Sequence, residues 1–143
     1  MTGQIGVVSL RGLYHEDSAY PFNLASGITV SDVGKAVTID SSGANKVKLA
    51  GDADPILGRL EQVEDRSAEG ILVGTVMIAG GLVFTVNPDA TASPDETPAL
   101  GDFICGGTSS TPTKGYVQRS ATATRWQVVE MLESNAKVVA IKL

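Results

Sequence analysis

The sequence has too few reactive side chains to assemble most of the common enzyme sites. Its 143 residues include one cysteine, Cys105, and one histidine, His15. A single cysteine excludes an intramolecular disulfide, and a Ser-His-Asp or Cys-His site would have to use His15. His15 is followed by two acidic residues, so we expect it to be solvated. Cys105 follows "DFI" in an apolar stretch, where a small buried residue is the ordinary role.

Phosphate-binding glycine loops and metal-ligand spacings are also absent. The stretches "GLVFTV", "GDFICGG" and "SDVGKAV" contain neither GxGxxG nor GxxxxGK[ST]. The acidic pairs in "GDADP" and "SPDE" lack the spacing of a calcium loop, and they fit solvated turns. One histidine and one cysteine need two carboxylates to complete a zinc site. We therefore predict no enzyme activity, no catalytic residues, no metal and no cofactor, although a hydrolase using Asp and Glu pairs is a disfavoured alternative.

Positive charge is scarce as well. Eleven Lys and Arg residues face sixteen Asp and Glu residues, which gives a net charge of −5, and the arginines are dispersed. Because nucleic-acid binding requires a positive surface, we expect no nucleic-acid partner. The charge-free stretch 70–88, "GILVGTVMIAGGLVFTVNP", is interrupted by Gly80-Gly81, so we interpret it as two strands and expect no membrane partner. Residues 1–13 have no basic start and no long apolar run, so we expect no signal peptide.

The sequence does contain many short apolar stretches separated by turn residues. It has sixteen glycines and six prolines, and 43% of its residues are hydrophobic. This pattern predicts an all-β fold, a compact small β-barrel or β-sandwich, with residues 28–143 as a single β-domain. Residues 1–27 lack such regular spacing, and we interpret them as an extended N-terminal arm that lies on its own domain or on a neighbour.

Several segments have the alternation of half-buried strands. Residues 37–40 and 46–49 flank "SSGAN" and predict a hairpin. Residues 55–64 and 124–133 favour strands, but a short helix remains possible for both. In the latter, Trp126, Val128 and Leu132 share one parity. Further strands are expected in "DFIC", "KGYVQRS" and "KVVAIKL".

The stretch 71–86, "ILVGTVMIAGGLVFTV", predicts a second hairpin with Gly80-Gly81 as its two-residue turn. In that register Met77 would lie opposite Phe84. Both faces of this hairpin would be apolar, so both need a cover. We expect one face to lie on the core and the other to lie under a second sheet layer, the arm or another subunit. For contact with another subunit, the interface candidates are Val76, Ile78 and Val83.

The order of these patterns is informative as a whole. From Tyr20 to the C-terminus it runs through "VGKAVTI", "VKLA", "PILGRLEQVE", the Gly-Gly stretch and "ALGDFI". In this order the chain resembles the small β-rich decoration, or cement, proteins of tailed-bacteriophage heads. The resemblance implies a structural protein of the virion that lies on the outer surface of the capsid. There it would bind the major capsid protein, bridge capsid subunits and often form trimers, with no catalytic residues.

On this interpretation the N-terminal segment lies along capsid protein. Its apolar residues follow neither a strand period nor a helix period strongly enough to fold alone. The capsid-contact candidates are Ile5, Val7, Val8, Leu10, Leu13 and Tyr14. The alternative is a head-surface module that binds a host receptor or a glycan through loops 87–101 and 106–113. Those loops lack the aromatic residues that glycan sites use.

Overall fold

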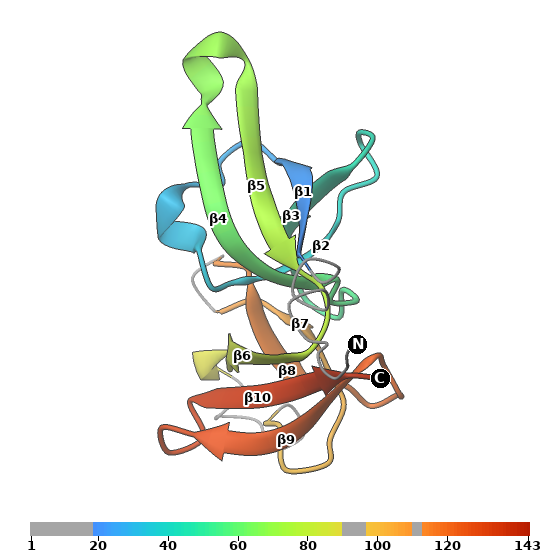
Figure 1. Ribbon diagram of the computed structural model, residues 1–143. Coiled ribbons are helices and arrows are strands. Elements are labelled where there is room, and N and C mark those ends of the chain that lie inside the picture. Colours follow the sequence, from blue (N-terminus) through green and yellow to red (C-terminus); the bar gives the residue numbers. More distant parts are fainter. Residues whose placement is uncertain (1–18, 90–96, 110–112) are drawn as a thin grey trace, which may run out of the picture.

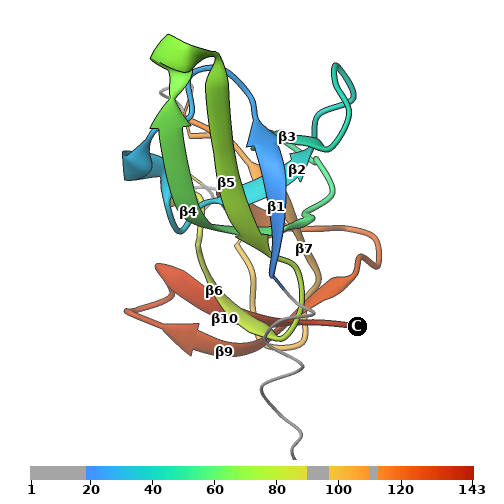
Figure 2. The same ribbon diagram turned by 45° about the horizontal axis from the view of Figure 1, so that its top comes forward.

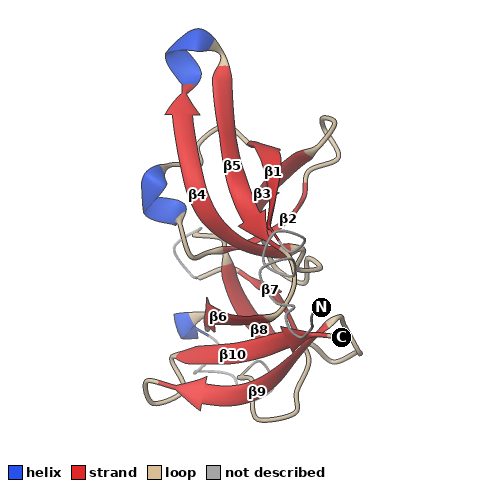
Figure 3. Ribbon diagram, in the orientation of Figure 1, coloured by secondary structure: helices blue, strands red, loops and turns tan. Residues whose placement is uncertain are grey.

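A computed structural model describes residues 19–89, 97–109 and 113–143. These residues form ten strands and no α-helix, and the short helical turns are 3-10 helices, including η1 (Val30–Asp32) and η2 (Ser67–Glu69) (Figure 3). The predicted all-β fold is therefore confirmed, and of the two architectures considered the chain adopts a closed barrel with additional small sheets.

The barrel uses the first five strands of the described chain. In barrel order they are β1 (Ala19–Leu24), β3 (Lys46–Leu49), β2 (Ala36–Ile39), β4 (Gly58–Arg66) and β5 (Ile71–Met77). β1 runs parallel to β3, and the other neighbours are antiparallel. The long strands β4 and β5 pair with each other, β5 lies beside β1, and both extend past the rest of the barrel (Figures 1 and 2). Their alternating apolar residues meet Leu24, Val37 and Val47 in the barrel core.

A second layer lies below the barrel in the view of Figure 1. It contains a three-stranded antiparallel sheet in the order β6 (Gly81–Thr85), β10 (Lys137–Lys142) and β9 (Trp126–Leu132). The pair β7 (Ile104–Gly107) and β8 (Tyr116–Arg119) completes it. A second apolar core joins the two layers, because Ala36 and Ile56 of the barrel region pack with residues of this layer such as Phe84.

Trp126 is the largest fully buried side chain of that second core. Its indole Nε1 donates a hydrogen bond to the main-chain oxygen of Ile56 at 3.0 Å. Its ring packs edge-on against Phe84, with 5.4 Å between ring centroids and an interplanar angle of 84°. The only polar atom of the side chain is therefore satisfied by the segment that enters β4, and burial of the indole ties the sheet to the barrel.

The predicted hairpin over residues 71–86 is wrong. β5 pairs with β4 and β1 inside the barrel, whereas β6 pairs with β10 in the other sheet. Gly80, with a φ of 87°, lies in the connection between the two layers instead of in a two-residue hairpin turn. Each strand buries one of its faces in its own layer, and the apolar pattern carries no information about which strands pair.

The predicted boundary of the arm is also wrong. Ala19–Leu24 forms β1 of the barrel, and both Leu24 and Ile28 belong to the barrel core. The apolar spacing of this stretch is loose because Pro21 and Asn23 occupy positions on the exposed side of β1. Residues 1–18 lie outside the described residues, so the prediction of an arm now concerns only that segment.

Both ambiguous segments form strands, β4 and β9, and residues 36–39 and 46–49 form the expected antiparallel pair. β9 contains an irregularity in its pairing with β10: Ala140 pairs with Val128, but Val139 pairs with Glu130. The extra residue, Val129, shifts the parity of the strand. Beyond it Met131, and not Leu132, packs against the core, so the expected shared parity of Leu132 with Trp126 is wrong.

Gly58 begins β4 at a point where two strands approach closely. A Cβ built on this residue would lie 2.1 Å from the main-chain oxygen of Met77 on β5. Any side chain would therefore push β4 away from β5 and open the barrel. At Gly81 on β6 a Cβ would meet no atom closer than 3.7 Å, the Cγ2 of Ile141. The two glycines thus offer a matched comparison.

We predict that Gly58→Ala destabilises the protein by about 2 kcal/mol or more, because the added methyl group overlaps main-chain atoms. Gly81→Ala should change the free energy of unfolding by less than about 0.5 kcal/mol. Urea unfolding followed by the fluorescence of Trp126 measures both. Equal stability of the two variants would contradict the role given to Gly58.

Candidate functional site

Among the described residues, no group of three or more His, Cys, Asp or Glu side chains lies close enough together to hold a metal ion. His15 lies outside the described residues, as do Asp95 and Glu96. Asp52 Oδ1 accepts a hydrogen bond from the main-chain N–H of Thr108 at 2.7 Å. Asp54 Oδ2 accepts one from Gly51 at 2.9 Å. These contacts give both acids the turn-forming role that the sequence favoured.

Cys105 lies on β7 and is buried. Burial raises the pKa of its thiol above the ordinary value. Its Sγ lies 4.0 Å from the main-chain oxygen of Arg119, which is a weak contact. Since the thiolate is the reactive form, a buried thiol with a raised pKa is a poor nucleophile. The side chain has the packing role that its sequence context indicated.

Two exposed acids fix turns in the barrel. The pKa of Asp40 lies below its ordinary value because Ser42 donates hydrogen bonds to the carboxylate, with further contributions from Lys46 and Lys48. The pKa of Asp65 is lowered in the same way by Ser67. Because the pKa of each carboxyl is lowered, these contacts stabilise the folded state at pH values above the ordinary pKa of Asp. This stabilisation is lost as the pH falls through the lowered pKa.

Three cations gather in a groove between η1, β4 and the edge of the three-stranded sheet. Each is paired with an acid: Lys35 with Asp32 at 2.8 Å, Lys137 with Glu133 at 3.3 Å, and Arg59 with Glu61. Arg59 also donates to the main-chain oxygen of Val83 at 3.2 Å. The acids offset the positive charge, so this groove does not resemble a phosphate-binding surface.

The three subunit-interface candidates have different environments. Val76 is wrong as an interface residue, because its side chain is 0% exposed and packs in the barrel core. Ile78 is half-buried and packs against the same core. Val83 is half-buried on β6 and pairs with Val139 of β10. The six capsid-contact candidates, Ile5, Val7, Val8, Leu10, Leu13 and Tyr14, all lie outside the described residues.

Val83 belongs to a larger apolar surface that the sequence analysis did not define. On β10, Val138 and Ala140 are buried, whereas the alternate residues Val139 and Ile141 point to the opposite side of the sheet. Ile141 is 39% exposed and lies beside Gly81, which has no side chain to cover it. We call Val83, Val139 and Ile141 the outer sheet face. The continuous apolar run "VVAI" was the available signal, since a strand with one wet face would alternate.

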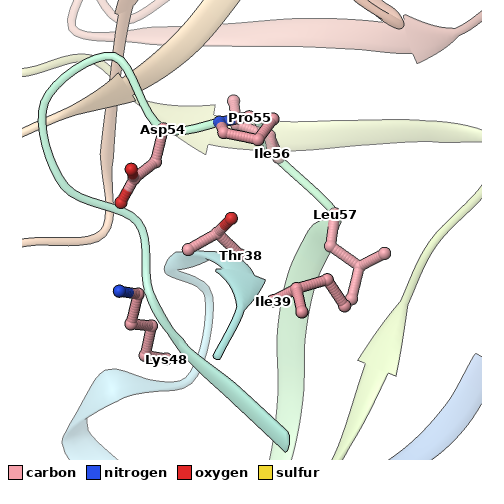
Figure 4. A pocket seen from close by; sticks show the side chains of 7 residues that line it. All are labelled: Thr38, Ile39, Lys48, Asp54, Pro55, Ile56 and Leu57. Atoms are coloured by element: carbon pink, nitrogen blue, oxygen red, sulfur yellow. The ribbon is translucent and has the colours of Figure 1, made fainter. Parts of the chain in front are cut away.

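A second surface feature is the open pocket shown in Figure 4. It lies where the β2–β3 pair meets the segment that precedes β4. Its lining residues are Thr38, Ile39, Lys48, Asp54, Pro55, Ile56 and Leu57. Leu57 and Ile39 form an apolar side, and Lys48 and Asp54 form a polar side. Nothing in the sequence marked these residues as a group, because they come from three separate segments.

No family model, no curated protein and no solved structure matches this chain. In the part of the chain that the structure describes, no helix is long and apolar enough to span a membrane.

We predict that Ellman's reagent modifies Cys105 in the native protein at least about tenfold more slowly than in the urea-unfolded protein, because burial lowers the thiolate fraction and blocks access. The absorbance of the released thiolate at pH 8 measures both rates. Equally fast modification of the native protein would show that the thiol is accessible, and would reopen a reactive role for it.

Proposed function

We propose that this chain is a non-enzymatic structural protein of a tailed-phage virion. It binds the major capsid protein on the outer surface of the capsid and bridges capsid subunits. The resemblance to decoration proteins supports this proposal. The net charge of −5 fits a position away from the packaged DNA.

The outer sheet face is the observation that carries the proposal. The described chain buries one side of the β6-β10-β9 sheet against the second core, yet the other side carries Val83, Val139 and Ile141 next to its polar residues. Contiguous apolar surface of this kind usually marks a site of protein–protein contact. We assign this face to self-association, and the trimeric state to the resemblance alone. Residues 1–18 remain the proposed capsid contact.

The energetics suit a protein that acts in many copies. Full burial of one large apolar side chain contributes about 1.5–3 kcal/mol before the cost of ordering the chain. A few such residues give each copy a modest net affinity. A ligand that binds only the assembled shell shifts the equilibrium toward assembly, and the effect grows with the number of occupied sites.

We expect Ile141→Lys to weaken self-association, because it places a charge on the outer sheet face. Ile71→Lys is the matched control, since Ile71 is 37% exposed but lies on β5 near the far end of the long β4–β5 pair. Light scattering coupled to size-exclusion chromatography measures the oligomer. A wild-type protein that is strictly monomeric at high concentration would contradict the assignment.

Deletion of residues 1–18 ends before β1 and should therefore leave the barrel folded. We expect the shortened protein to bind less tightly to capsids purified without it, because the candidate apolar contacts are lost. Co-sedimentation at increasing protein concentration gives both affinities, and the unfolding transition confirms that the barrel is intact. If the shortened chain binds as well as the full chain, the segment is not a capsid contact. If neither binds, the decoration function itself is wrong.

A further inference from the structure

The pocket of Figure 4 exists because the pairing of β2 with β4 stops early. The ladder between these strands pairs only Ala36 with Arg59 and Val37 with Gly58. Leu57 then donates its main-chain N–H to the oxygen of Val37 at 2.8 Å, and the chain before it turns away at Pro55. Among the described residues, the last two positions of β2 therefore have no strand partner on this side.

Thr38 places a polar atom at the centre of this opening. The residue is only 4% exposed, and its hydroxyl makes no hydrogen bond to any other described residue. Figure 4 shows the hydroxyl pointing into the space between Asp54 and Leu57. A buried hydroxyl without a partner is unfavourable, and native proteins rarely keep one without a reason. A group supplied by a ligand would satisfy it.

Beside Thr38, the rim of the pocket carries one charge of each sign. Lys48 forms no ion pair with another described residue, and Asp54 uses Oδ2 for Gly51, which leaves Oδ1 available. A carboxylate and an ammonium side by side complement a peptide group, whose N–H donates and whose oxygen accepts. The pocket has no net charge to attract an ion, and none of the described residues that line it is aromatic, as a sugar site would require.

The apolar side completes the description. Ile39 is 56% exposed, although it lies at the end of a barrel strand, and Leu57 lies beside it. We infer that this pocket binds an extended segment of a partner protein, one apolar side chain of which packs between Ile39 and Leu57. The main chain of that segment lies across the pocket and forms hydrogen bonds with the side chains of Thr38, Lys48 and Asp54. This inference rests on the proposed function and gives the capsid partner a second contact in addition to residues 1–18.

The test uses two capped peptides with extended-chain preference, Ac-TTLTT-NH2 and Ac-TTSTT-NH2, added to the full-length nitrogen-15-labelled protein. We expect the leucine peptide to shift the amide signals of Thr38, Ile39 and Leu57, and the serine peptide to bind at least about fivefold more weakly, since it lacks the apolar anchor. Thr38→Val keeps the shape and removes the hydroxyl. This substitution should lower the affinity for the leucine peptide about fivefold, which corresponds to the loss of one hydrogen bond. It should not lower the melting temperature of the protein.

Lysine variants supply the matched control. Lys48→Gln should weaken binding, whereas Lys46→Gln, two residues earlier on the same strand but outside the pocket, should not. The inference is overturned if the leucine peptide leaves the pocket signals unchanged at millimolar concentration, or if both peptides bind equally. Unchanged affinity of Thr38→Val would also overturn it, since the hydroxyl would then be satisfied by water alone.

The outcomes separate this inference from the proposed function. If the wild-type protein binds the leucine peptide but does not sediment with capsids, the decoration function fails and the pocket stands. If the wild-type and Thr38→Val proteins sediment equally well with capsids and neither binds the peptide, the pocket inference fails alone.

Discussion

The buried indole of Trp126 is the contact on which the arrangement of the two layers depends. Its ring packs against Phe84 of the three-stranded sheet, and its Nε1 donates to the oxygen of Ile56, in the segment that enters the barrel. One residue further on, Leu57 is bonded to Val37 of β2. The segment 56–57 is thus fixed from both sides, by the sheet through Trp126 and by the barrel through Val37.

This anchoring has a consequence for the surface. Asp54 and Pro55 directly precede the fixed segment and form one wall of the pocket, while Thr38 and Lys48 line it from the barrel. Because the wall is bonded to both layers, the pocket does not depend on a loop that must be ordered when a partner binds. A preformed site loses less conformational entropy on binding than a mobile one. A short site can therefore contribute useful affinity.

The sequence predicted the fold class and most strands, because alternation and turn residues are local signals. It placed strands correctly at residues 36–39, 46–49 and 137–142, and β4 and β9 where a helix was also considered. The predicted pairing of β5 with β6 was wrong, because two consecutive apolar strands have the same sequence pattern whether they share a sheet or lie in different sheets. Met131 replaced Leu132 in the core because an extra residue in β9 reverses the parity, and no sequence signal marked Val129 as that residue.

The candidate surfaces were harder to predict for a physical reason. Val76 and Val83 have the same side chain in similar apolar contexts, yet one lies in the barrel core and the other on the outer sheet face. Which of two apolar faces is covered depends on the layer packed against it, and therefore on long-range topology. The hydroxyl of Thr38 shows the same limit: a threonine in a short strand is ordinary, and only the early end of the β2–β4 ladder isolates it. The two surfaces lie on different layers joined by Trp126, so a partner bound at one stabilises the folded unit that presents the other.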